Sequence, residues 1–151
     1  MYDIETMDLG KLEKDQNGKI IAVAPVLSIA YIDCDGKKCY IKNEYEKNPI
    51  EGEKQLLRNH LTIISDYDIL LGWNSRGFDD TYIIQRCQHH GIDERAMYEL
   101  NRMDYMQIVE KNVYPKPDSM SLDYVSKELL GFQKVEIGHK GQGVIYELWK
   151  N

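Results

Sequence analysis

The sequence predicts an α/β fold in which a mixed central β-sheet is flanked by helices. Residues 20–33 (IIAVAPVLSIAYID) are apolar and rich in β-branched side chains. A Gly-containing turn joins them to residues 38–43 (KCYIKN), which indicates a β-hairpin. Farther along, helical patterns at 51–67 and 78–91 surround a short apolar run at 68–73. This alternation of strands and helices favours a sheet that is covered by helices.

The first half of the chain is expected to supply most of the strands. YDIET at residues 2–6 is interpreted as the end of a strand, and the polar residues 8–19 as a loop. Pro25 is expected to mark the start of the next strand, because proline is tolerated at a strand's first residue. The run DILLGW at 68–73 is almost wholly apolar, as in a strand buried on both faces.

Two segments show strong helical signals. Residues 51–67 carry apolar side chains at helical spacing, at Leu56, Leu57, Leu61, Ile63 and Ile64. Residues 78–91 begin with acidic side chains and end at Gly91, which are start and stop signals for a helix. His89 and His90 precede that glycine, at a helix end where an imidazolium is favourable.

A last helix is expected at residues 119–131, after a short extended piece. Ser119 or Ser121 is a candidate N-cap, because a serine hydroxyl can accept a hydrogen bond from the first turn. Gly131 is the expected end of this helix.

The composition is that of one ordinary globular domain. The chain has 151 residues, of which 42% are hydrophobic and 29% charged. No apolar stretch approaches the roughly 18–20 residues that a membrane helix needs. The N-terminus also lacks the pattern of a signal peptide, so we expect a cytoplasmic protein without a membrane partner.

Cysteine usage and net charge narrow the function classes. Cys34, Cys39 and Cys87 form an odd count without a Cys-x-x-Cys pair, which favours reduced thiols over disulfides or zinc. The formal net charge of −6 argues against a large basic surface that grips duplex DNA. It is compatible with a protein that handles a few nucleotides of a single strand in a metal-containing cleft.

Asp3 and Glu5 are the first candidate site residues. Side chains alternate along a strand, so the two carboxylates share one face while Ile4 points to the other. Neighbouring carboxylates repel each other and are either solvated or hold a cation. Both interpretations are open for this pair alone.

The segment NSRGFDD supplies the second candidate group. Asn74 follows the predicted buried strand, and Asp79 lies at the start of the next helix, where a carboxylate is favourable. Sites form at strand ends in open α/β sheets. The structural alternative makes Asn74 a turn residue, Phe78 a core aromatic and Asp79 a helix cap.

Together the two groups resemble the first two exonuclease motifs of family B DNA polymerases, D-I-E and N-x-x-x-F-D. The matching stretches are YDIET at 2–6 and GWNSRGFDDTYI at 72–83. Residues 24–43 look like the hairpin after the first motif, and 52–79 match the helix and strand before the second. Residues 102–131 are similar to a strand-end Asp, a helix and S-L-x-x-V-x-x-x-x-L-G. The resemblance covers nearly the whole chain.

This resemblance implies a ribonuclease H-like three-layer fold and 3′→5′ proofreading of DNA by two divalent metals. By motif matching, Asp3, Glu5 and Asp79 are the implied catalytic metal ligands, with Glu5 also near the terminal 3′-hydroxyl. Hard oxygen ligands suit Mg²⁺ or Mn²⁺. Two such ions close together can activate a water and clamp a phosphate.

The same matching implies the substrate-binding residues. Asn74 is expected to hold the strand near the scissile phosphate, and Phe78 to pack against the terminal nucleotide, since an aromatic ring stacks on any base. Thr6 is expected to take part in substrate binding. The implied partners are the single-stranded 3′ end of DNA and the remainder of a parent polymerase chain.

The sequence departs from the family in its third motif, Y-x-x-x-D, which supplies a fourth carboxylate from a helix. Tyr31–Asp35 runs from a strand into a turn, and Tyr114–Asp118 contains two prolines that a helix interior does not tolerate. The variant with a catalytic histidine also fails, because Val144 stands five residues after His139. We therefore interpret residues 1–151 as a single exonuclease domain that stops before the third motif.

Two further acidic residues, Asp104 and Asp123, match family positions outside the metal site. We interpret both as structural, and Asp123 as an exposed helix residue. Three functions remain open. The first is a proofreading exonuclease, of which residues 1–151 alone are expected to be weak or inactive. The others are a non-catalytic ribonuclease H-like module that binds nucleic acid or a partner, and a nuclease acting on RNA. A nucleoid-associated or, in a eukaryote, nuclear location is expected.

Overall fold

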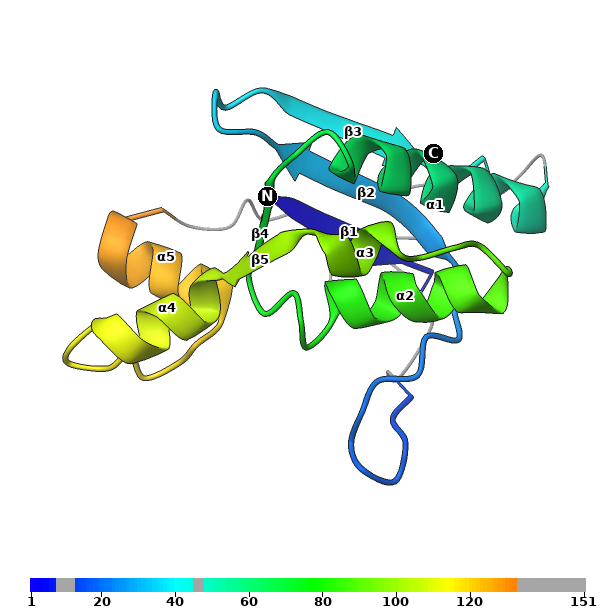
Figure 1. Cartoon of the computed structure of the whole chain (residues 1–151). Coiled ribbons are helices and arrows are strands. Elements are labelled where there is room, and N and C mark those ends of the chain that lie inside the picture. The colour runs from blue at the N-terminus through cyan, green and yellow to red at the C-terminus, as the bar shows by residue number, and fades with distance from the viewer. Residues whose placement is uncertain (8–12, 45–47, 133–151) are drawn as a thin grey trace, which may run out of the picture.

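The structure is a computed structural model that describes residues 1–7, 13–44 and 48–132 (Figure 1). Residues 133–151, which include His139 and Val144, lie outside these ranges.

A three-stranded antiparallel sheet contains β1 (Tyr2–Thr6), β2 (Val26–Ile32) and β3 (Lys38–Lys42) in spatial order β1-β2-β3. Residue Tyr2 pairs with Tyr31, and the register shifts at a bulge between Glu5 and Thr6. The predicted strand end and hairpin are confirmed, and β2 begins directly after Pro25.

A parallel pair, β4 (Ile69–Gly72) and β5 (Asn101–Asp104), adjoins this sheet because β4 contacts β1. The α/β fold with mixed strands is therefore confirmed. The prediction that the first strand of this pair is buried on both faces is only half right. Leu70 and Gly72 are buried, but Ile69 is half exposed, because the described residues cover the second face incompletely.

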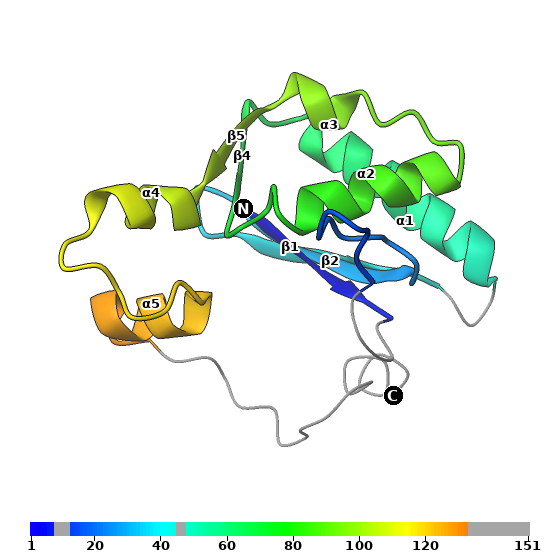
Figure 2. The same ribbon diagram turned by 90° about the horizontal axis from the view of Figure 1, so that it is seen from below.

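The helices α1 (Pro49–Ile64), α2 (Asp79–His89) and the short α3 (Ala96–Glu99) lie on one face of the three-stranded sheet (Figure 2). The Asn48 side chain caps α1 by accepting a hydrogen bond from the Glu51 amide. The apolar face of α1 contributes to the core with β1, β2 and α2. The core residues include Ile4, Val26, Ile29, Leu56, Leu57, Ile64, Tyr82 and Ile83.

The helices α4 (Tyr105–Asn112) and α5 (Leu122–Leu130) lie beyond β4 and β5 (Figures 1 and 2). Ser121 caps α5, and Gly131 ends it with a left-handed φ of 71°, as the sequence predicts. The single turn of α3 was not predicted. The helix α4 is the one that the family resemblance implied after a strand-end Asp, which is Asp104 at the end of β5.

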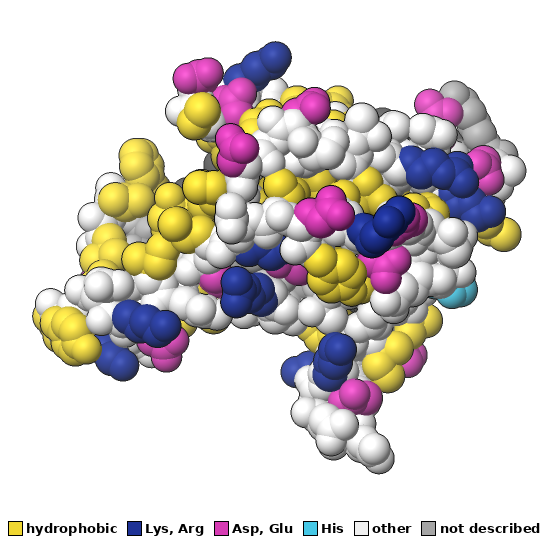
Figure 3. Space-filling view, in the orientation of Figure 1, with side chains coloured by type: hydrophobic (Ala, Val, Ile, Leu, Met, Phe, Trp, Pro, Cys, Tyr) yellow, Lys and Arg dark blue, Asp and Glu magenta, His cyan; other side chains and the backbone are white. Residues whose placement is uncertain are grey.

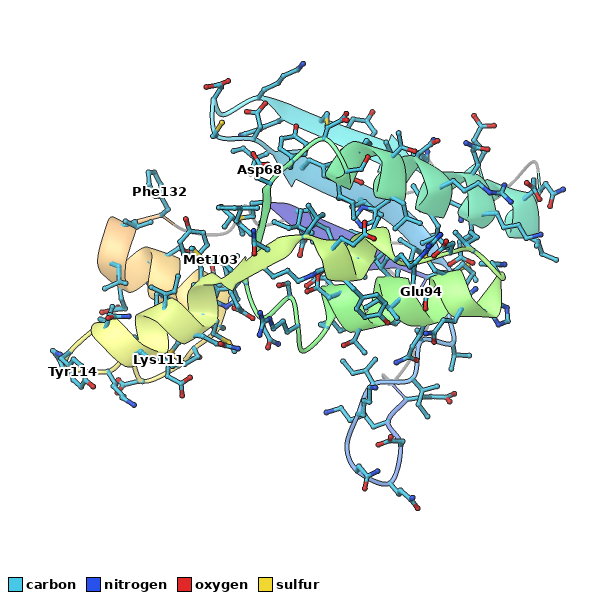
Figure 4. All side chains as sticks on the ribbon, in the orientation of Figure 1. Asp68, Glu94, Met103, Lys111, Tyr114 and Phe132 are labelled. Atoms are coloured by element: carbon cyan, nitrogen blue, oxygen red, sulfur yellow. The ribbon has the colours of Figure 1, made fainter. Side chains whose placement is uncertain are left out.

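Exposed apolar side chains gather over the α4–α5 end of the molecule (Figure 3). Tyr114 and Phe132 extend outward there (Figure 4), and both are largely exposed. All three cysteines are free thiols, as predicted. None of the helices in the described ranges is long and apolar enough to cross a membrane.

A buried ionic cluster fastens α1 to α2. The Glu53 carboxylate accepts hydrogen bonds from Arg86 Nε (2.8 Å) and Nη2 (2.6 Å), and His90 Nε2 lies 2.6 Å from Glu53 Oε2. The Val26 amide also donates to Glu53 Oε1 at 2.9 Å. Burial alone raises the pKa of Glu53, but the contacts with Arg86 and His90 outweigh it and hold that pKa below its ordinary value.

Glu53→Ala is expected to lower the free energy of unfolding by about 3–5 kcal/mol, because it leaves the buried Arg86 without its carboxylate. Urea unfolding at pH 7 measures the change. Glu51→Ala is the matched control on the same helix: Glu51 is 56% exposed and pairs with Lys54 and Arg58. Glu51→Ala should lower the free energy of unfolding by about 0.5 kcal/mol or less. Equal, small losses in both variants would show that the cluster does not stabilise the helix pair.

Candidate active site

Strand β1 presents the two predicted carboxylates on its outer face. Asp3 and Glu5 are exposed, whereas Tyr2 and Ile4 are buried in the core. The alternation predicted from the sequence is therefore observed. Thr6 ends the strand in a half-buried position, just after the bulge.

Asp79 meets β1 from the start of α2. Its carboxylate oxygen Oδ1 accepts a hydrogen bond from the Ile4 amide at 3.2 Å, which places it between the backbone positions of Asp3 and Glu5. Only 5% of Asp79 is exposed. The residue is the first of the helix rather than its cap, since Phe78 occupies the N-cap position.

The electrostatics of Asp79 are unfavourable for a bare carboxylate. Burial and then the nearby negative charge of Asp3 raise the pKa of Asp79 to about 7, and the hydrogen bond from the Ile4 amide opposes this only in part. A bound cation would relieve both effects. The oxygen donors of Asp3, Glu5 and Asp79 are of the kind that Mg²⁺ and Mn²⁺ prefer.

The three side chains do not form a closed metal cage. Within the described ranges, no group of three His, Cys, Asp or Glu side chains is arranged so that it could hold a metal ion. Asp79 is fixed by its hydrogen bond, while Asp3 and Glu5 stand at the surface.

The turn between β4 and α2 carries Asn74 and Phe78. Asn74 is exposed and has a left-handed φ of 55°, which is uncommon outside glycine and enriched in asparagine. The Asp104 carboxylate at the end of β5 accepts hydrogen bonds from the amides of Asn74 (2.9 Å) and Met106 (3.0 Å). It thus fixes the turn and caps α4, which confirms Asp104 as a structural residue. Asp123 is exposed on α5, as predicted.

The Asn74 side chain lies against Gly77 within the turn. A Cβ atom on residue 77 would lie 2.5 Å from Asn74 Oδ1, so a larger residue there would displace the exposed Asn74 side chain. Phe78 is half buried, and its ring centroid lies 5.5 Å from that of Tyr82. Phe78 therefore serves partly as a core aromatic, the structural role that the sequence left open.

Comparison with known proteins agrees with the observed α/β fold. A family model described as the RNase H superfamily matches residues 1–151. The chain belongs to the RNase H superfamily. The predicted ribonuclease H-like fold is thereby confirmed.

Curated relatives of this RNase H-superfamily chain are DNA polymerases. The chain is 26% identical over 147 residues to a DNA polymerase of Methanocaldococcus jannaschii, covering 84% of this chain and 9% of that protein. It is 26% identical over 97 residues to a DNA polymerase of Thermococcus kodakarensis, covering 61% of this chain and 5% of that protein. The chain thus spans a small part of the relatives it matches.

A solved structure shows the same fold. The family B DNA polymerase of the archaeon Pyrobaculum calidifontis matches 99% of this chain and 20% of its own, with a TM-score of 0.71 and 20% identity. The resemblance to family B DNA polymerases, drawn from the two motifs, is confirmed.

Sequence reasoning missed the contacts just beneath the site. Tyr2, Asp80 and Arg102 meet in the interior next to Asp3 and Asp79. The doublet Asp79–Asp80 is the one sequence signal for them, because a second carboxylate in the same helical turn needs a partner of its own.

The pKa of Asp79 predicts a pH-dependent stability. Its pKa is higher folded than unfolded, so its contribution is fully present below about pH 4 and is lost as the pH rises through about 7. The free energy of unfolding of Asp79→Asn, relative to the unsubstituted protein, should therefore rise by about 1–3 kcal/mol between pH 5 and 8.

Urea unfolding at several pH values without divalent metal measures this difference. Burial lowers the pKa of His60 to about 3, so His60 lowers the free energy of unfolding as the pH falls below about 6.5. This effect is the same in both proteins and cancels in the difference. A difference that does not change with pH would contradict the account of Asp79.

Proposed function

We propose that this chain is the 3′→5′ exonuclease domain of a family B DNA polymerase and removes 3′-terminal nucleotides during proofreading. The observation that carries the proposal is Asp79, buried against β1 beside Asp3 with its pKa raised. A buried carboxylate next to a second one, in the order and spacing of the two motifs, supports a cation site rather than a chance acidic surface.

The proposed ligands are Asp3, Glu5 and Asp79, and the proposed ions are Mg²⁺ or Mn²⁺. When bound, a pair of such ions supplies an activated water and neutralises charge on the phosphate and the leaving oxygen. Asp79 is held by the Ile4 amide, and Asp3 and Glu5 flank Ile4 on the outer face of β1.

The turn before α2 is proposed to hold the substrate. Asn74, held in its left-handed conformation by Asp104, donates to the strand near the scissile phosphate. The half-buried ring of Phe78 stacks against the terminal base. Thr6 follows Glu5 at the end of β1 and contacts the same nucleotide.

The proposed substrate is the single-stranded 3′ end of DNA, delivered by the remainder of a polymerase chain. The relatives support this context, because the matched part is 9% and 5% of their lengths. A polymerase would work on the nucleoid in the cytoplasm, or in the nucleus of a eukaryote.

A polypeptide of residues 1–151 is expected to digest single-stranded DNA weakly, because only three of the four motif carboxylates are matched within it. Incubation of 3′-labelled oligonucleotide with Mg²⁺ or Mn²⁺ measures the rate. Asp3→Ala should reduce any residual rate by about a hundredfold or more, since an absent metal ligand removes the charge stabilisation of the transition state. Robust digestion by residues 1–151 that depends on Asp3 would show that the fourth carboxylate is dispensable, and digestion that survives Asp3→Ala would refute the site.

A non-catalytic nucleic-acid or partner-binding module is the second candidate. It is favoured by one observation, namely that no three acidic side chains of the described residues converge as a metal site does. A nuclease site should still bind Mn²⁺, whereas a pure scaffold has no reason to.

Thermal unfolding with increasing Mn²⁺ separates the two candidates. For the nuclease, millimolar Mn²⁺ should raise the unfolding temperature by a few degrees, as binding to the folded state requires, and Asp79→Ala should abolish the rise. Asp66→Ala, at an exposed position after α1, is the control and should keep the rise. A rise that Asp79→Ala leaves intact, or no rise, favours the scaffold.

A further inference from the structure

We propose that Tyr2 and Asp80 are positioning residues, whose buried contact sets the spacing between Asp3 on β1 and Asp79 on α2. This inference rests on the proposed function, because it concerns how the proposed metal ligands are held. Neither residue is itself a ligand.

The contact joins residues that are distant in the sequence and deep in the fold. The Tyr2 hydroxyl donates a hydrogen bond to Asp80 Oδ1. Only 3% of Tyr2 and 5% of Asp80 are exposed. A charge-assisted hydrogen bond in such surroundings is strong and directional, so it constrains both elements.

Arg102 extends the contact to β5 and α3. Its Nη1 lies 2.5 Å from Asp80 Oδ1, and its Nε donates to the Met97 carbonyl at 3.0 Å. The Asp80 side chain therefore has one fixed place, set by β1 on one side and β5 on the other.

The positions of these residues relate the contact to the site. Tyr2 precedes Asp3 on β1, and Asp80 follows Asp79 on α2. The Ile4 amide makes the second link between the same two elements, to Asp79 Oδ1. Two links at adjacent residues fix both the distance and the rotation of the α2 start against β1, whereas one link would leave a pivot.

The carboxylate at position 80 pairs with the largely buried Arg102 and also accepts the hydrogen bond from Tyr2. Its second oxygen, Oδ2, is buried without a hydrogen-bond partner among the described residues, which lowers stability. An apolar side chain would avoid that loss, but it would leave Arg102 without its carboxylate and Tyr2 without its acceptor. Residues that hold metal ligands in place commonly carry such directional contacts.

Tyr31 provides the matched control. It lies opposite Tyr2 in the β1–β2 register, and its hydroxyl lies 2.8 Å from Nδ1 of the buried His60. Tyr31→Phe and Tyr2→Phe thus remove the same group from neighbouring places in one core. The Tyr2 hydroxyl bonds the α2 start that carries Asp79, whereas the Tyr31 hydroxyl bonds α1.

The experiment is a Mn²⁺ titration of the protein followed by the electron paramagnetic resonance signal of free Mn²⁺, below the unfolding temperature of each variant. Tyr2→Phe is expected to raise the dissociation constant by about tenfold, the usual scale for residues that support metal ligands. Tyr31→Phe should change the dissociation constant by about twofold or less. It should lower the unfolding temperature by about as much as Tyr2→Phe does. Asp80→Asn should also weaken Mn²⁺ binding. The double variant Tyr2→Phe, Asp80→Asn should bind Mn²⁺ about as weakly as Asp80→Asn alone, because both substitutions disrupt the same contact.

Two results overturn the inference, and they differ. If the unsubstituted protein binds Mn²⁺ in a manner that Asp79→Ala abolishes, but Tyr2→Phe and Tyr31→Phe have equal affinity, the contact is only structural and the proposed function stands. If the unsubstituted protein shows no binding that depends on Asp79, the metal site fails and this inference fails with it.

Discussion

The hydrogen bond from the Ile4 amide to Asp79 Oδ1 is the interaction on which the arrangement of the candidate site depends. It joins the first strand to a helix that begins 75 residues later. Because side chains alternate along β1, the same contact that fixes Asp79 leaves Asp3 and Glu5 on the outer face. The core beneath β1 and the buried contact between Tyr2 and Asp80 also hold these two elements together.

The buried carboxylates differ in how their charge is balanced. Glu53 faces Arg86 and His90, and Asp80 faces Arg102. Asp79 has the Ile4 amide on one side and the negative charge of Asp3 on the other. The buried Asp79 thus lies beside a second carboxylate, and a cation at this place would supply the charge that balances the pair.

The sequence predicted the features that depend on local pattern. The hairpin, α1, α2 and α5 follow from periodicity, and Pro25, Ser121 and Gly131 mark element ends as predicted. The ends of α1 did not follow, because the helix begins at Pro49 after the Asn48 cap and stops at Ile64, not over 51–67. The alternation of Asp3 with Ile4 follows in the same way. The single turn of α3 did not follow, because four residues are too few to show a periodicity, and α4 was expected only from the family resemblance.

The periodicity of the sequence did not predict contacts between residues that are distant along the chain. Asp80 and Tyr2 stand 78 positions apart, and no periodicity relates them. The half burial of Phe78 and the exposure of Ile69 likewise depend on which elements pack against them. The motifs predicted which residues belong to the candidate site, whereas the fold determines how each of them is held.

The most direct test of the central claim is paramagnetic broadening of backbone amide signals by Mn²⁺ in an ¹H–¹⁵N spectrum of this chain. If the junction of β1 and α2 holds the cation, the amides of residues 3–5 and 78–80 lose intensity first, at substoichiometric Mn²⁺. Amides of α5 should keep their intensity. Broadening that begins at another acidic part of the chain, or equally everywhere, would contradict the account.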